Sequence, residues 1–323
     1  MSRRLALYCG ITILILTSIA VVGAAPAQQG DPGLAALNAA NAQLAAQGLA
    51  IRAEAIEFLT LGEGRPSNRI HQQPFRWVPN DARRLAQGTD ITYLVDQSDG
   101  KTASGLKNTD TEPAIDRALA TWQADSCLSK VRIVKRADPG TDPDIFDSFF
   151  GFGRFGNPFL ADIVNAGWYP RAYFEAVGGP GGGRGILAFS VTFIFVNDDG
   201  SPTDINGDNY LDTALNEVYY NDTFGDRKDD RAGNPWAIDQ PLPAFDVETV
   251  ALHENGHSKE TCRIPDKHTL RAWEWLEGPQ TMKVGDRVRA PEVITGEADV
   301  LPVERGEMTQ MILGVSGPML VKD

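Results

Sequence analysis

Cysteine and histidine are scarce in this chain, which has only three cysteines and four histidines among its 323 residues. So few thiols exclude a disulfide-dense scaffold and a cysteine-rich zinc module. Cys9 lies close to the N-terminus, so Cys127 and Cys262 are the pair that could form one disulfide in an oxidising compartment. Two unpaired thiols are the alternative, because sequence spacing does not reveal the geometry that a disulfide needs.

Positive charge is also in short supply. Lys and Arg total 30 against 43 Asp and Glu, and the formal net charge is −13. This acidic balance argues against a nucleic-acid partner or an anionic membrane surface. The hydrophobic share of 42% and the charged share of 23% are typical of a soluble globular protein. A chain of this length is long enough for one or two domains with a substantial core.

Long apolar runs are missing except near the start. Residues 1–4 include two arginines, residues 5–23 are apolar, and residues 24–27 are small. This order predicts a secretory signal peptide over residues 1–27, cleaved after Ala27. An uncleaved membrane anchor is the alternative, because the run is nearly long enough to span a bilayer. We expect a secreted or extracellular protein, with the periplasm as a second destination, and no membrane partner after cleavage.

Two of the four histidines flank a glutamate in the string His253-Glu254-Asn255-Gly256-His257. On a helix, positions i and i+4 project from the same face, so both imidazoles can bind one metal ion. Zinc accepts neutral imidazole nitrogens, and catalytic zinc sites keep one position for water. The glutamate can take a proton from that water. The pattern His-Glu-x-x-His on a helix therefore indicates a zinc hydrolase, usually a metalloprotease.

The residues before this string predict the helix that it needs. Asp246 is a suitable N-cap, and it follows Pro241 and Pro243, which interrupt regular structure. Residues 247–252 then lead into the string without Gly or Pro. A chance match on a buried helix, with two ordinary hydrogen-bonded histidines, is the alternative. Because histidine is so rare in this chain, we favour the zinc interpretation.

The order of predicted elements indicates an α+β fold. Residues 28–88 contain a predicted helix at 33–47 and a strand at 50–60, and we expect them to form a small N-terminal helix–strand subdomain. The remaining predicted elements are an amphipathic helix at 111–124 and strands at 91–96, 131–134, 186–196 and 217–220. The Phe-rich stretch 144–169 favours a loop packed over the sheet, with a substrate-binding wall as the alternative. The glycines of 178–183 predict a flexible loop.

Oxygen-bearing side chains recur at calcium-loop spacing before the helix. Asp204, Asn206, Asp208 and Asp212 occupy positions 1, 3, 5 and 9 of such a loop. The pattern departs from an EF-hand, because position 6 is not glycine and position 12 is not glutamate. Asp and Asn are also ordinary turn formers. Calcium binding and a solvated turn both remain open for this segment.

Several segments carry a family resemblance. They are Ile91-Thr92-Tyr93 and residues 118–122, 162–168, 217–222 and 247–258, the last of which contains His253, Glu254 and His257. Together they resemble the bacterial matrixin-like zinc metallopeptidases of the metzincin clan over about half of the chain. The resemblance implies a metzincin-like catalytic domain at 89–258, with a twisted mixed sheet and an active-site helix beneath it. It also implies secretion and peptide-bond hydrolysis.

The chain departs from that family after Ser258. In the clan the motif continues to a glycine and a third histidine, where this chain has Glu260 and Arg263, and no methionine turn is recognisable. Arginine is always cationic and cannot donate a lone pair to zinc. Residues 259–323 are therefore a divergent C-terminal segment, in which His268 or Glu277 could supply the third zinc ligand. A disrupted reading frame or a loss of catalysis would also account for the departure.

The leading hypothesis is a secreted zinc-dependent endopeptidase that hydrolyses protein or peptide substrates through a metal-activated water. His253 and His257 would bind zinc, and Glu254 would be the general base. The alternative is a catalytically impaired binding protein on the same scaffold, suggested by Arg263. A third idea is a calcium-dependent surface protein that uses Asp204 and Asp208.

Overall fold

The computed structural model describes residues 31–61, 75–85, 88–124, 131–226, 233–239 and 244–257, together with four short strands near the C-terminus. Its centre is a seven-stranded sheet in the order β1-β6-β7-β5-β3-β4, with β2 paired to β7. The strands of this sheet are β1 (Ile51–Thr60), β2 (Phe75–Arg76), β3 (Ile91–Val95), β4 (Ile133–Lys135), β5 (Ile163–Tyr169), β6 (Ile186–Phe195) and β7 (Leu211–Asn221).

The sheet is mixed. Strand β6 runs antiparallel to both β1 and β7, whereas β7, β5, β3 and β4 run parallel to one another. The described helices are α1 (Pro32–Ala46), α2 (Asn108–Gln123), α3 (Arg171–Gly178), α4 (Gly182–Gly185), α5 (Val247–His257) and the 3-10 turn η1 (Asp147–Phe150). A mixed sheet with these helices is a mixed α/β architecture, compatible with the α+β class expected from the sequence.

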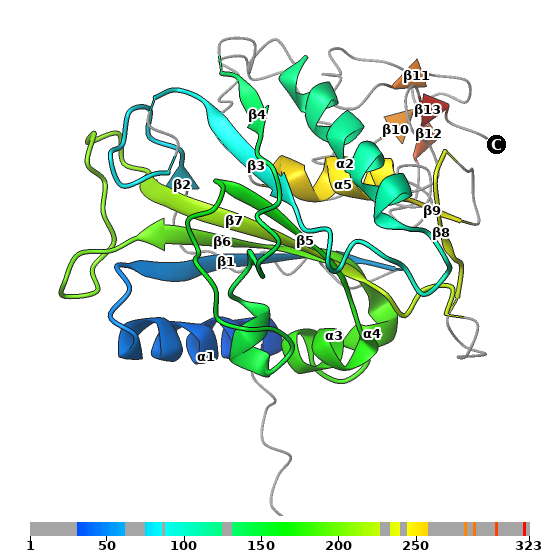
Figure 1. The fold of residues 1–323 in the computed structure, drawn as a ribbon, viewed down its shortest axis with the longest axis horizontal. Helices are drawn as coiled ribbons and strands as arrows, with labels where there is room; N and C mark the ends of the chain where they lie inside the picture. Colours follow the sequence, from blue (N-terminus) through cyan, green and yellow to red (C-terminus); the bar gives the residue numbers. More distant parts are fainter. Residues whose placement is uncertain are drawn as a thin grey trace, which may run out of the picture. The chain divides into compact units, whose positions relative to one another are not determined.

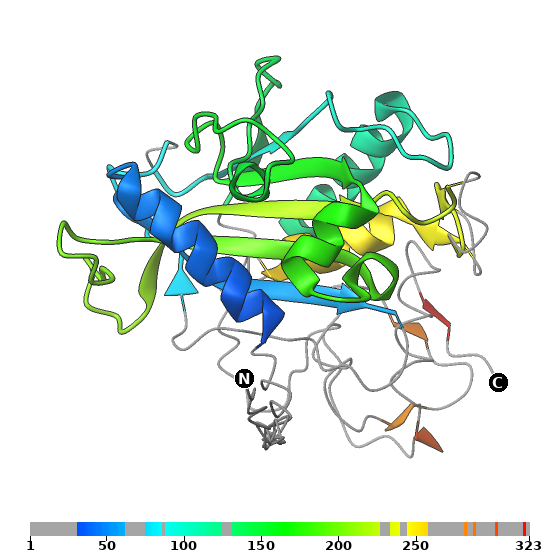
Figure 2. The same cartoon turned by 90° about the horizontal axis from the view of Figure 1, so that it is seen from below.

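Helices cover both faces of the sheet (Figures 1 and 2). One core cluster joins α2 and α5 to the sheet through residues such as Ile115, Trp122 and Val250. A second cluster joins α1 and α3 to the sheet through residues such as Leu44 and Phe174. Because a sheet alternates its side chains, neighbouring residues of one strand enter different clusters. The two faces are therefore separate environments, which becomes important for the sites below.

Strands β6 and β7 are buried along their whole lengths. Burial on both faces explains why β6 reads as a continuous apolar run rather than as an alternating one, and the strand expected at 186–196 is confirmed. Strand β7 is longer than the predicted 217–220, since it begins at Leu211. Its first half contains Asp212 and Asn216, whose buried polar side chains bond to Arg83 and to Thr192 and hide the strand pattern in the sequence.

Most of the other predicted elements are present. Helices α1 and α2 and strands β1, β3 and β4 coincide with their predicted ranges to within a few residues. Helix α3 and the strand nature of 163–169 were not predicted. The loop expected at 178–183 is partly helical, because Gly178 ends α3 and Gly182 begins α4.

The helix and strand expected to form an N-terminal subdomain are part of the main α/β structure. Strand β1 pairs with β6 from Ile51 to Thr60, and α1 packs on the same face as α3. Asp31 caps α1 by accepting a hydrogen bond from the backbone N–H of Gly33 at 2.9 Å. Strand β1 thus extends the sheet by one edge strand instead of building a sheet of its own.

The remaining described strands form small pairs: β8 (Trp236–Ala237) with β9 (Phe245–Asp246), β10 (Thr281–Met282) with β12 (Leu301–Pro302), and β11 (Arg287–Val288) with β13 (Met319–Leu320). Within the part of the chain that the structure describes, no helix has both the length and the apolar character needed to cross a membrane. The predicted signal peptide, Cys127, Cys262, Glu260, Arg263, His268 and Glu277 all lie outside the described residues.

Candidate active site

The helix predicted for the His-Glu-x-x-His string is confirmed as α5, which runs from Val247 to His257. Asp246 caps its first turn, since its Oδ2 accepts hydrogen bonds from the backbone N–H of Thr249 at 2.9 Å and from the Thr249 hydroxyl at 2.8 Å. An N-cap carboxylate satisfies amide groups that have no partner inside the helix. The local sequence therefore starts the helix where the string needs it.

The structure places His253 and His257 four residues apart on α5, with Glu254 between them. His253 is half-buried, whereas Glu254 is fully buried. His257 is the last residue of the helix, and its side chain lies outside the described part. Burial, and after it the charge of Glu254, raises the pKa of Tyr220 on β7 well above its usual value. Tyr220 belongs to the same core cluster as Val250 of α5, so the helix packs against this face of the sheet.

Asn255, an unassigned position of the string, anchors α5 to the sheet. Its amide Nδ2 donates to Asn165 Oδ1 on β5 at 3.1 Å and to the carbonyl of Ala251 at 2.8 Å. The hydroxyl of Tyr220 donates to the same Asn165 Oδ1 at 2.7 Å. Because these groups are buried, the bond between Asn255 and Asn165 restricts the rotation of α5 about its axis, and the bond from Tyr220 holds Asn165 in place for it. The sequence offered no signal for this network, since its members are far apart in the chain.

Gly256 lets α5 approach α2 closely. A Cβ atom at this position would lie 2.8 Å from Cζ2 of Trp122, closer than real contacts of this kind. The indole Nε1 of Trp122 donates to the carbonyl of Leu252 at 2.8 Å, so the ring cannot easily move away. The glycine of the string thus has a packing role between the two helices on this face (Figure 1).

The loop with calcium-like spacing is held by protein donors. Asp204 accepts backbone N–H bonds from Asp208 at 3.1 Å and Asn209 at 2.9 Å. Asp208 accepts from the guanidinium of Arg76 at 2.8 Å. The side chains of Arg83 and Thr203 both donate to the carboxylate of Asp212.

Asn206 accepts from the backbone N–H of Asp208 at 3.3 Å. Among the described residues, the carboxylates of this loop do not converge as a metal-binding group would. The loop is a hydrogen-bonded turn, and calcium binding there stays a prediction.

A different acidic group does converge. Asp142, Asp144 and Asp147 each offer a carboxylate oxygen within 4.8 Å of the others. Sequence patterns did not single them out, although a signal existed: three acids occur within six residues at the start of a stretch rich in Phe and Gly. The predicted packing over the sheet is confirmed for the first part of this stretch, because Ile145 and Phe146 are fully buried in the cluster with α1 and α3. It is wrong for residues 163–169, which form strand β5 of the sheet itself.

Helix α5 could supply two of the three protein ligands that a catalytic zinc site requires. Two imidazoles at helical spacing suit zinc, which favours nitrogen ligands in a four-coordinate site. A third protein ligand is required for a catalytic site, and both candidates, His268 and Glu277, lie outside the described residues. The residues of α5 therefore fit part of a zinc site. No protein-family model matches the chain, and no curated protein matches it significantly.

Proposed function

We propose that this protein is a secreted zinc-dependent endopeptidase with a metzincin-like catalytic domain. The observation that carries the proposal is the placement of His253, Glu254 and His257 on one capped helix. Positions four apart on a helix lie on one face, so imidazoles at these two positions could share a metal ion. The mixed sheet with α5 packed on one face is the arrangement that the family resemblance implies, and it supports the proposal.

The residues of α5 would divide the chemistry between them. Zinc bound by His253 and His257 would supply a Lewis acid that lowers the pKa of a water molecule and polarises the substrate carbonyl. Glu254 accepts the proton from the attacking water and later delivers it to the leaving amine. Because Glu254 is buried, bulk water screens its charge weakly, and its carboxylate interacts strongly with any nearby proton.

Neighbouring residues position this chemistry. Asn255 holds the helix against β5, and Trp122 with Gly256 sets its distance from α2. A catalytic group displaced by about 1 Å can lose about 100-fold in rate. Buried contacts on both sides of α5 are therefore what a hydrolytic site on this helix would require.

The proposal is tested by Glu254→Gln. The amide keeps the shape but cannot accept the proton, so we expect peptide hydrolysis to fall by about 100-fold or more while zinc content is unchanged. The control is Glu248→Gln on the same helix, whose carboxylate bonds to Arg117 instead. Hydrolysis assays and metal analysis of both purified variants decide the matter. Full activity in Glu254→Gln would rule out the general-base role.

The second candidate is a secreted binding protein that has lost catalysis. The observation in its favour is Arg263, which stands where the family has its third histidine. Two imidazoles alone hold zinc weakly. A zinc titration coupled to a peptide-hydrolysis assay separates the candidates, and His268→Ala and Glu277→Gln identify the third ligand. An endopeptidase binds zinc tightly and cleaves peptide, whereas the binding protein does neither.

A further inference from the structure

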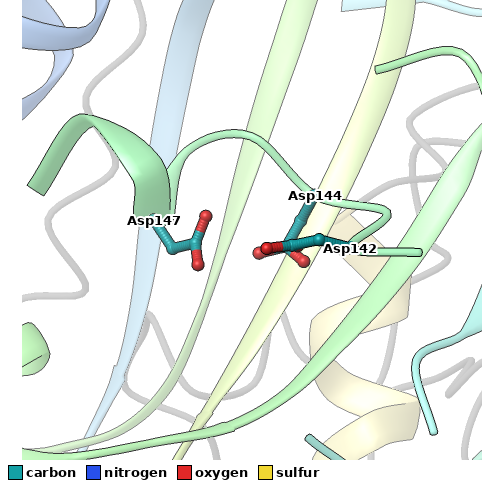
Figure 3. A group of neighbouring side chains, drawn as sticks. All are labelled: Asp142, Asp144 and Asp147. Atoms are coloured by element: carbon teal, nitrogen blue, oxygen red, sulfur yellow. The ribbon is translucent and has the colours of Figure 1, made fainter. Parts of the chain in front are cut away.

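The three converging carboxylates lie on the face of the sheet opposite α5. Asp142 and Asp144 come from the segment between β4 and β5, and Asp147 begins the turn η1 (Figure 3). Tyr219 and Tyr220 are adjacent on β7, and their side chains lie on opposite faces of the sheet. Tyr219 packs in the cluster with α1 and α3, whereas Tyr220 packs in the cluster with α5. The acidic group is thus separate from the proposed catalytic helix.

These carboxylates are buried without enough partners. Asp144 and Asp147 have 0% exposed surface. Oδ1 of Asp142, Oδ1 of Asp144 and both oxygens of Asp147 accept no hydrogen bond. Within the described residues, no lysine or arginine forms an ion pair with any of the three. Buried carboxylates are normally paired or bound to metal, because desolvating an unpaired charge is costly.

The partners that these residues do have engage only one oxygen each of Asp142 and Asp144. The hydroxyl of Tyr169 donates to Asp144 Oδ2 at 2.9 Å, and the backbone N–H of Arg154 donates to Asp142 Oδ2 at 2.9 Å. A Cβ atom at Gly153 would lie 1.8 Å from Asp147 Oδ2, so only glycine lets the backbone pass this carboxylate. Asp142 and Asp144 are therefore each held by one donor, Asp147 by none, and the three carboxylates point toward one another (Figure 3).

Further negative charge lies next to the group. Glu217 on β7 accepts hydrogen bonds from the backbone N–H groups of Ile145 at 2.9 Å and Phe146 at 3.1 Å. Burial, followed by the charges of Asp147 and Glu217, raises the pKa of Asp144 well above its usual value. Burial and the charge of Asp142 raise the pKa of Asp147 to about 7. Either bound protons or a bound cation must offset this repulsion.

We propose that Asp142, Asp144 and Asp147 form a calcium-binding site that fastens the 142–157 segment to the sheet. All three ligands are oxygens, with no histidine or cysteine among them, which selects a hard cation. Calcium binds oxygens at about 2.4 Å, so ligands on opposite sides of the ion can be about 4.8 Å apart. Magnesium needs a smaller and more regular octahedron, which makes it the poorer fit.

Tyrosine-sensitised terbium luminescence tests the site directly. Terbium(III) replaces calcium at oxygen sites, and Tyr169 is hydrogen-bonded to one of the proposed ligands. We expect the full secreted chain, stripped with EGTA, to give terbium emission on excitation of tyrosine, and added calcium to quench it. Calcium alone should also raise the melting temperature. Absence of both effects would overturn the proposal.

Two double variants locate the ion. Asp144→Asn with Asp147→Asn removes two charges at nearly constant shape and should weaken calcium binding by about tenfold or more. The matched control is Asp204→Asn with Asp208→Asn, which alters the turn that has calcium-like spacing. Retained calcium response in the first variant, or its loss in the control alone, contradicts the proposed position. If the first variant does not fold, the half-buried Asp142→Asn supplies the same comparison.

Discussion

The indole Nε1 of Trp122 donates a hydrogen bond to the carbonyl oxygen of Leu252 at 2.8 Å and so connects α2 to α5. The bonded carbonyl lies one residue before His253. The indole ring also fills the space over Gly256. One side chain therefore sets both the distance between the two helices and their relative position along the helix axes. The helix that carries the candidate catalytic residues is therefore positioned by a residue more than one hundred positions earlier.

Gly256→Ala tests this contact. In an exposed helix the change would be favourable, because alanine has the higher helix propensity. Here the added methyl would meet Trp122, so we expect a loss of about 1–3 kcal/mol in unfolding free energy. Urea denaturation measures the loss. Combining Gly256→Ala with Trp122→Leu should restore part of it through a coupling between the two changes. Strictly additive effects would show that the ring does not limit the approach.

The buried ion pair between Arg84 and Asp162 gives a second prediction. Arg84 Nε donates to Asp162 Oδ1 at 3.1 Å, and the Thr92 backbone N–H donates to Oδ2 at 2.7 Å. Both charged side chains are only 1% exposed. Arg84→Met leaves a buried charge without its cation, and we expect a loss of about 3–5 kcal/mol in unfolding free energy.

Thermal and urea unfolding measure this effect. The control is Arg171→Met, which breaks a half-exposed pair with Glu175 one turn away on α3 and should change stability little. Adding Asp162→Asn to Arg84→Met should recover part of the loss, because the buried charge is removed as well. A loss for Arg84→Met no larger than that of the control would show that the pair is not desolvated in solution.

The acidic group makes stability depend on pH when calcium is removed. The pKa of Asp147 is raised to about 7 and that of Glu217 to about 8, in both cases chiefly by burial. The pKa of Asp144 is also raised, and that of Asp99 is raised by burial and by Asp142. The folded protein therefore binds more protons than the unfolded chain between the unfolded pKa values, near 4, and about pH 8.

Stability from these groups is complete below the unfolded pKa values and is lost as pH rises through the folded ones. In EGTA we expect the unfolding free energy of the wild type to fall between about pH 5 and 8 more steeply than that of Asp144→Asn with Asp147→Asn. Calcium should remove most of the difference at pH 8, because it replaces the protons. Chemical unfolding at several pH values measures the slopes. Equal slopes in both proteins would contradict the raised pKa values.

The sequence predicted those helices and strands whose formation depends on residues close to one another in the chain. Helix α5 was predictable because its cap, Asp246, and the run without Gly or Pro lie within a few residues of each other. Strand β6 was predictable because a strand covered on both faces must be apolar throughout. Strand β7 was predicted too short, because the burial of Asp212 depends on Arg83, which is distant in the chain.

The sequence by itself determined a capped helix that carries two histidines and a glutamate, since capping and helical spacing act over a few residues. Only the tertiary structure decided what surrounds that helix, including Asn165, Tyr220 and Trp122 from three other elements. Tertiary structure likewise brought arginines to Asp208 and Asp212 of the 204–212 turn, and it left Oδ1 of Asp144 and both oxygens of Asp147 without donors. Spacing along a chain shows which groups are near in sequence, whereas a carboxylate's need for a cation depends on burial and on partners that folding brings from elsewhere.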